Sequence, residues 1–303
     1  MAYTAEISRA NPSCFLFLID QSGSMQEILN PSDIQAMEQP FSADGKTYTH
    51  TANGKTKAEE VADAINRILQ NLSIKCAKEE GIRDYFEIGV IGYGGENISS
   101  HVCSAFGGAL SGRDLIKISE LAQSPARLEK RTKKVSDGAG GLVEQEVRFP
   151  VWFDPKSIGG TPMCKAMELA HKILSDWVAQ HQLSYPPILI NITDGESTDG
   201  DPTQVAESIK HLGTGDGNVN LFNVHISSQK SSPVEYPDTD SGLPDQYAKL
   251  LFNISSALPN HMQNIARQEG LKVTDGSRGF VFNADIVSLI RFLDIGTRPS
   301  NLR

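Results

Sequence analysis

The sequence predicts an α/β fold, a doubly wound and mostly parallel central sheet with helices on both faces. Short continuous apolar runs, such as CFLFLI at 14–19 and ILINIT at 188–193, are typical of strands buried on both faces. These runs alternate along the chain with longer segments of helical periodicity. Strands that alternate with helices pair in parallel, because each crossover helix returns the chain to the same end of the sheet.

The individual elements follow from local patterns. The predicted order is strand 14–19, helix 57–72, strands 85–93 and 142–153, helix 161–178, strands 186–193 and 218–227, helices 245–256 and 259–269, strand 279–283 and helix 285–296. In the first helix, apolar residues such as Val61, Ile65 and Ile68 recur every three to four positions and form one stripe. The second helix is predicted to begin with Thr161 as its cap and Pro162 in its first turn.

Two stretches, at about 26–56 and 94–141, interrupt this alternation. The first contains turn-forming sequences and is expected to be a loop with a small hairpin. The second includes the basic run RLEKRTKK at 127–134, for which we favour a solvated helical face over a grip on a phosphorylated partner. Neither stretch has enough apolar residues for a core of its own, so we predict one domain over 1–303 with two insertions.

Composition limits the function classes. Among 303 residues, 28 Lys and Arg stand against 37 Asp and Glu, a net charge of −9 that disfavours nucleic acid as a partner. The four cysteines contain no CxxC pair and are expected to be free thiols. The first residues show no secretory signal pattern, and no apolar run is long enough to span a membrane. We therefore expect a cytoplasmic protein without a membrane partner.

Three polar clusters follow or precede predicted elements at one end of the sheet. Asp20, Ser22 and Ser24 follow the first strand, Thr161 precedes the second helix, and Asp194 closes the strand at 186–193. In open parallel sheets ligands gather at this end. Carboxylates and hydroxyls are hard oxygen ligands, which suit Mg²⁺, Mn²⁺ or Ca²⁺ better than zinc or copper. The alternative is that each aspartate only caps its own loop.

These clusters carry a resemblance to a known family. The segment DQSGS at 20–24 resembles the DxSxS motif of von Willebrand factor A (VWA) domains, GGTPM at 159–163 resembles the threonine loop of that family, and TDG at 193–195 resembles its second aspartate. The three occur in family order. The segment from HMQNIARQEG through GFVFNADIVSLIRFLDIG also resembles the end of a VWA domain. The resemblance covers about 14–25 and 142–296 and leaves the insertions unexplained.

The resemblance implies a Rossmann-like fold with a metal-ion-dependent adhesion site (MIDAS). By analogy, Ser22, Ser24 and Thr161 would bind the cation directly, whereas Asp20 and Asp194 would act through water and hydrogen bonds. Mg²⁺ is the first choice, and Mn²⁺ or Ca²⁺ is possible. The open coordination position would take an Asp or Glu carboxylate from a partner protein.

The same resemblance implies binding and not catalysis. Intracellular members of the family act as recruitment or assembly subunits, among them partners of AAA+ ATPases and of kinase–phosphatase and tellurium-resistance systems. We therefore expect a bacterial cytosolic module in signalling, stress response or assembly.

Two other readings stay open at this stage. One is a Mg²⁺-dependent phosphohydrolase on a Rossmann-like sheet, although such enzymes use a DxD pair and Ser22 stands at the second position here. The other is a VWA scaffold whose metal site is vestigial or covered by the insertions. A metal titration tests the second reading, and turnover of a phosphate ester tests the first.

Overall fold

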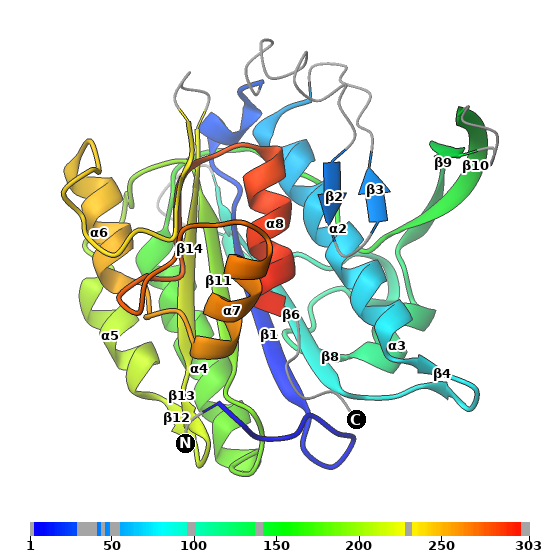
Figure 1. Cartoon of the computed structure of the whole chain (residues 1–303), viewed down its shortest axis with the longest axis horizontal. Helices are drawn as coiled ribbons and strands as arrows, with labels where there is room; N and C mark the ends of the chain where they lie inside the picture. The colour runs from blue at the N-terminus through cyan, green and yellow to red at the C-terminus, as the bar shows by residue number, and fades with distance from the viewer. Residues whose placement is uncertain are drawn as a thin grey trace.

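The computed structural model describes residues 3–28, 41–43, 46–48, 55–95, 101–136, 142–227 and 232–297. They form a central sheet of eight strands with helices on both faces, which confirms the predicted fold class (Figure 1). The strand order is β15 (Val234–Glu235), β16 (Phe280–Ala284), β14 (Asn220–Ile226), β11 (Ile188–Thr193), β1 (Ser13–Asp20), β6 (Phe86–Gly94) and β7 (His101–Ser104), and β8 (Ile116–Lys117) also pairs with β6.

The five central strands are parallel, and antiparallel strands lie at the edges. Strand β1 pairs in parallel with β11 and β6 on its two sides, while β7 and β8 pair antiparallel with β6, and β15 pairs antiparallel with β16. Every residue of β1 is buried. Phe17 packs into the core on one face and Leu18 into the core on the other, which explains the continuous apolar run in the sequence.

Helices cover the sheet in two layers. One face carries α2 (Lys57–Lys75), α3 (Ile118–Gln123), α7 (Asn260–Gln268) and α8 (Ile286–Thr297), and the other carries α4 (Met163–Gln180), α5 (Thr203–His211) and α6 (Gln246–Ile254). All these helices except α3 and α5 were predicted. Helix α5 buries only Ala206 and Ile209, so its apolar pattern is too short to distinguish it from a loop.

The other elements lie outside the central sheet and its covering helices. They are the 3₁₀ turns η1 (Gly23–Gln26) and η2 (Gly108–Leu110) and the strand pairs β2 (Phe41–Ala43) with β3 (Lys46–Tyr48), β4 (Ala77–Lys78) with β5 (Gly81–Ile82), β9 (Arg127–Ser136) with β10 (Leu142–Val151), and β12 (Gly213–Thr214) with β13 (Gly217–Asn218). The pair β2–β3 is the small hairpin predicted within 26–56. Most of the remainder of that stretch lies outside the described residues.

The ribbon β9–β10 corrects one prediction. The basic run at 127–134 is a strand and not a helical face, and the strand predicted at 142–153 pairs with it instead of joining the central sheet. Pairing with β10 overrides the helical propensity of the run. Arg131 on β9 anchors the ribbon to α2, because its guanidinium donates to Asp63 at 2.8 Å, and the same guanidinium lies 3.7 Å from the ring centre of Phe149 on β10. The ribbon extends away from the sheet (Figure 1).

A row of buried polar side chains crosses the sheet. The Tyr93 hydroxyl on β6 donates to the Asn191 side chain on β11 at 2.7 Å, and the Asn191 amide donates to Asn223 on β14 at 3.0 Å. The Asn223 amide then donates to the Ser255 hydroxyl, just after α6, at 2.9 Å. The row satisfies polar groups that would otherwise destabilise the core.

Two findings bear on the expected compartment without deciding it. The four cysteines are free. In the part of the chain that the structure describes, no helix combines the length and the apolar character needed to cross a bilayer. The cytoplasmic location therefore stays a prediction.

Candidate metal centre

Asp20 ends β1 with a fully buried side chain. One carboxylate oxygen accepts the Ser22 backbone N–H at 2.8 Å, and the other accepts the Thr193 hydroxyl at 2.6 Å. Both donors are neutral, so they satisfy the oxygens without balancing the charge. Burial raises the pKa of Asp20 to about 6, although these hydrogen bonds act in the opposite direction. This carboxylate would gain stability from a nearby cation.

Ser22 and Ser24 connect the first loop to the second aspartate. Their hydroxyl oxygens lie 3.1 Å apart, and the Ser24 hydroxyl donates to Asp194 at 2.7 Å. Ser22 is buried whereas Ser24 is exposed, so the cluster opens to solvent on the Ser24 side. The sequence predicted this proximity, since both loops leave the same end of neighbouring parallel strands.

Asp194 has a partner that the sequence analysis did not identify. Its second oxygen accepts the Lys57 ammonium at 2.9 Å, and the same ammonium donates to Glu27 at 2.7 Å. The Asp194 side chain is fully buried and Lys57 is 4% exposed. Burial acts to lower the pKa of Lys57, but the two carboxylates outweigh it and raise that pKa. Lys57 therefore neutralises one of the two predicted metal-site carboxylates.

The position of Lys57 follows from the start of α2. Thr56 and Glu59 form a capping box, in which each side chain accepts the backbone N–H of the other residue, and this fixes Lys57 as the first helical residue. The sequence TKAE does signal the capping box, but 137 residues separate Lys57 from Asp194 and nothing in the pattern indicates their contact. Thr193, the donor to Asp20, also gave no signal of its own.

The loop before Thr161 is bonded to the loop after β1. The Ile158 N–H donates to the Gln21 carbonyl at 2.7 Å, and the Gly23 N–H donates to the Gly159 carbonyl at 2.9 Å. Gly94 permits this approach, because a Cβ there would lie 2.6 Å from the Gln21 carbonyl oxygen. The threonine loop is thus held beside Ser22 and Ser24 by backbone contacts.

The predicted capping role of Thr161 is wrong. Helix α4 begins at Met163, and Asp199 satisfies its first turn by accepting the N–H groups of Cys164 at 2.9 Å and Lys165 at 3.0 Å. Thr161 is buried, and its hydroxyl lies 3.9 Å from where a Cβ on Gly195 would stand. Because Asp199 caps α4, the Thr161 hydroxyl does not serve as a cap and faces the turn that carries Asp194.

The structure brings four of the five predicted residues into one contact chain, from Asp20 through Ser22 and Ser24 to Asp194. Thr161 joins them through the neighbouring loops. The donor atoms are oxygens, as a hard divalent cation requires. The described residues contain no group of three or more His, Cys, Asp or Glu that could hold a metal, so the hydroxyls are needed to complete a ligand set. The ligand type fits Mg²⁺, and the Lys57 ammonium, which Asp194 shares with Glu27, offsets part of the negative charge that would attract the cation.

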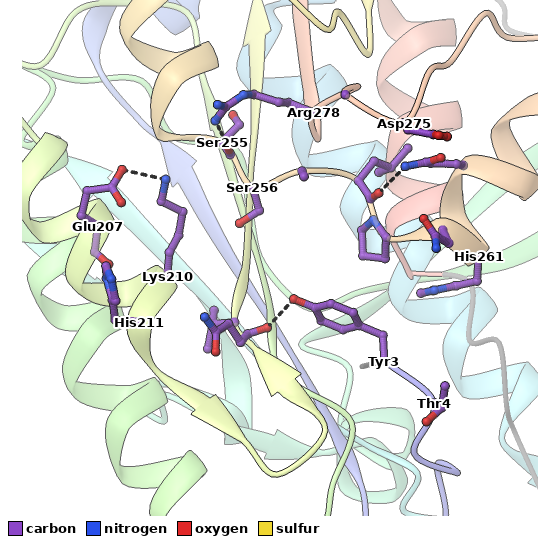
Figure 2. Close-up of a pocket in the computed structure, with 18 residues that line it drawn as sticks. Tyr3, Thr4, Glu207, Lys210, His211, Ser255, Ser256, His261, Asp275 and Arg278 are labelled. Atoms are coloured by element: carbon purple, nitrogen blue, oxygen red, sulfur yellow. Dashed lines mark hydrogen bonds and ion pairs between the residues drawn. The ribbon is translucent and has the colours of Figure 1, made fainter. Parts of the chain in front are cut away.

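A separate cavity of about 910 Å³ lies beyond the opposite end of β14 and contains none of the five predicted residues. Figure 2 shows Lys210, paired with Glu207, and Tyr3, which donates to the Asn218 carbonyl at 3.2 Å. Arg278 there donates to the carbonyl of Ser255 at 2.7 Å. These polar side chains already have partners within the protein, so the cavity does not compete with the metal centre as the primary site.

Comparisons with known proteins gave distant likenesses only. No family model matches the chain, and no curated protein matches it. Among solved structures, the vWF domain of the type V pili tip protein Mfa5 from Porphyromonas gingivalis is similar over 62% of this chain and 39% of its own, with 14% identity and a TM-score of 0.30. The PilB minor pilin from Streptococcus sanguinis is similar over 95% of this chain and 61% of its own, with 9% identity and a TM-score of 0.40. The chain thus spans less than two thirds of either protein, and the fold assignment rests on the strand order and flanking helices alone.

Proposed function

We propose that this chain is a protein-binding module of the VWA type that docks an acidic residue of a partner through a divalent cation. The observation that carries the proposal is the contact chain from Asp20 to Asp194, which gathers oxygen ligands from two strand ends at one edge of the sheet. The resemblance of the three motifs supports a recruitment or regulatory role in the cytoplasm, with a AAA+ ATPase, kinase or phosphatase system among the possible partners.

Each predicted residue has a role in this proposal. The hydroxyls of Ser22, Ser24 and Thr161 would ligate the cation, and Asp20 and Asp194 would hold those hydroxyls and the ordered waters in place. When bound, the cation would supply an electrophilic centre for a partner carboxylate. Neutral hydroxyl ligands leave most of the positive charge on that centre, which favours an anionic ligand from outside.

Lys57 favours a second candidate, a VWA scaffold that binds partners without metal. Its ammonium already supplies the positive charge that Asp194 would otherwise draw from a cation. In this case the buried ion pair would stabilise the loops, and partner contacts would come from the rim.

A calorimetric titration of chelator-stripped protein with Mg²⁺ and Mn²⁺ tests the two candidates. The first predicts one binding heat that the variant Asp20→Ala/Ser22→Ala lacks. A matched control, Asp240→Ala/Ser241→Ala, removes the same residue types from a loop outside the site and should bind like the wild type. If wild type and variant are both silent, the metal proposal is contradicted and the scaffold is favoured.

The same protein preparation is then incubated with Mg²⁺ and p-nitrophenyl phosphate. A binding module should release no phosphate above background. Turnover that disappears in Asp20→Ala/Ser22→Ala would contradict the binding role and favour the phosphohydrolase reading.

A further inference from the structure

A second pocket lies directly beside the candidate metal centre. It encloses about 260 Å³ between the start of α4, the loop after β11 and helix α6. Its lining includes Met163, Glu196, Asp201, Tyr247, Leu250 and Leu251. Gly195 follows Asp194 in the chain, so one turn borders both the metal centre and the pocket.

The pocket has an apolar interior. Met163 and Leu251 are almost fully buried and belong to the apolar core under α4 and α6, while Tyr247, which also lines the pocket, is 43% exposed. The interior can therefore accept the aliphatic part of a side chain.

The rim of the pocket is acidic. Glu196 and Asp201 are both exposed, and the described residues that line the pocket include no Lys, Arg or His. Asp201 accepts the backbone N–H and hydroxyl of Thr203 at 2.9 and 2.6 Å, and Glu196 raises the pKa of the neighbouring Tyr247 hydroxyl. These donors are neutral, so two negative charges stand at the mouth of an apolar pocket.

A long basic side chain matches this combination. Its methylene stem would lie against Met163, Leu250 and the Tyr247 ring, and its cation would meet Glu196 and Asp201. A purely apolar side chain would bury the stem equally well but would leave the two carboxylates without a counter-charge.

We propose that this pocket binds a lysine or arginine of the same partner segment that gives its carboxylate to the metal centre. The inference rests on the proposed function and adds the partner's chemistry to it: an acidic residue followed or preceded at short spacing by a basic one. Since a single turn separates the two sites, the spacing should be about one to three residues in an extended peptide, at roughly 3.3–3.6 Å per residue.

A selection from a random-peptide display library, with Mg²⁺ or with chelator, tests the pairing. Wild type should enrich peptides that carry an acidic residue with Lys or Arg at a fixed short spacing, and only when Mg²⁺ is present. The variant Glu196→Gln/Asp201→Asn should still enrich the acidic residue but should lose the preference for Lys or Arg. Both substitutions keep the size of the side chain, and the Asn amide oxygen can still accept from Thr203, so the local fold is retained.

A synthetic peptide from the selection quantifies the effect. Replacing its basic residue by norleucine, which keeps the stem and removes the charge, should weaken binding to wild type about fivefold and binding to the double variant very little. An equal loss for both proteins would overturn the inference.

Failure of the metal-dependent docking and failure of the pocket assignment would give different results. Enrichment of acidic peptides without a basic residue would contradict the pocket assignment and leave the metal-dependent docking intact. If no Mg²⁺-dependent enrichment occurs at all while the protein binds Mg²⁺ in the calorimeter, both the docking and the pocket assignment are contradicted.

Discussion

Asp20 is the last residue of β1 and Asp194 directly follows the neighbouring parallel strand β11, yet the charges of the two carboxylates are balanced differently. Asp20 is held by a backbone N–H and the Thr193 hydroxyl, whereas Asp194 is paired with the Lys57 ammonium. The first carboxylate keeps an unbalanced charge in the protein interior and the second does not. A bound cation would therefore gain most from Asp20, because the charge of Asp194 is already partly balanced by the Lys57 ammonium that it shares with Glu27.

The largest expected effect is a loss of Mg²⁺ affinity, and it should differ between Asp20 and the pair of Asp194 and Lys57. Asp20→Asn removes the unbalanced charge and should weaken Mg²⁺ binding at least about a hundredfold, roughly 3 kcal/mol. The double variant Lys57→Met/Asp194→Asn removes one charge of each sign and should weaken it less. Calorimetry measures both. If the double variant loses as much affinity as Asp20→Asn, the two strand ends contribute alike and the comparison is wrong.

The second effect is a pH dependence in the metal-free protein. Burial lowers the pKa of His225, which lies opposite Thr193 on β14, to about 4, and its Nδ1 accepts the Asn283 N–H at 3.3 Å. A lowered folded pKa means that stability is lost as pH falls from about 6.5 towards 4. Asp20 has a raised folded pKa of about 6, so it contributes in the opposite sense, with stability gained as pH falls from about 6 towards 4.

Single variants should separate these two opposite pH dependences of the unfolding free energy. Relative to wild type, lowering the pH from 7 to 5 should raise the unfolding free energy of His225→Gln by about 2 kcal/mol, because the opposing His225 contribution is removed, and should lower that of Asp20→Asn by about 1 kcal/mol, because the Asp20 contribution is removed. Urea unfolding at both pH values, with each variant referred to wild type, cancels all other titrating groups. If lowering the pH changed the unfolding free energy in the same direction in both variants, the pKa shift of either His225 or Asp20 would be wrong.

The third effect concerns the contact between the first loop and the threonine loop. Gly94→Ala places a methyl group against the Gln21 carbonyl and should reduce the unfolding free energy by about 2 kcal/mol. Gly242→Ala is the matched control, because a Cβ there meets nothing within 4 Å. Thermal unfolding measures both. Equal stabilities would mean that the loops do not depend on this approach.

The smallest effect concerns Lys57 itself. Lys57→Met removes a positive charge next to Asp194 and should strengthen Mg²⁺ binding about tenfold, roughly 1.4 kcal/mol, while it destabilises the metal-free protein by leaving a buried carboxylate without its cation. The Mg²⁺-induced rise in melting temperature should therefore exceed that of wild type. Lys55→Met, which removes a lysine paired with Asp63 outside the site, should bind Mg²⁺ as wild type does. Weaker binding in Lys57→Met would indicate that the lysine positions Asp194 for the cation.

The sequence predicted most of the sheet and its main helices because strands buried on both faces and long amphipathic helices carry strong local patterns. The sequence did not predict elements whose secondary structure depends on strand pairing or on tertiary contacts. The basic run in β9 becomes a strand only because β10 lies beside it, and the short helix α5 has too few buried residues to be recognised.

The residues of the candidate site also fall into those that the sequence predicts and those that depend on contacts formed on folding. The positions of Asp20, Ser22, Ser24 and Asp194 could be predicted because each follows a strand whose neighbours are set by the parallel topology. Lys57 could not, since a lysine at the start of a helix is usually solvated and its contact with Asp194 arises only from folding. The Asp199 cap of α4 was missed for the same reason.

The polar row from Tyr93 through Asn191 and Asn223 to Ser255 has a consequence for how this sequence can change over time. Each side chain satisfies the next, and Asn191 and Asn223 are fully buried. Replacing one member by an apolar residue leaves a neighbour without a partner inside the core, whereas replacing all of them together removes every unpaired group. In related sequences the four positions should therefore be inherited as a block, either all polar or all apolar, even though they are spread over more than half the length of the chain.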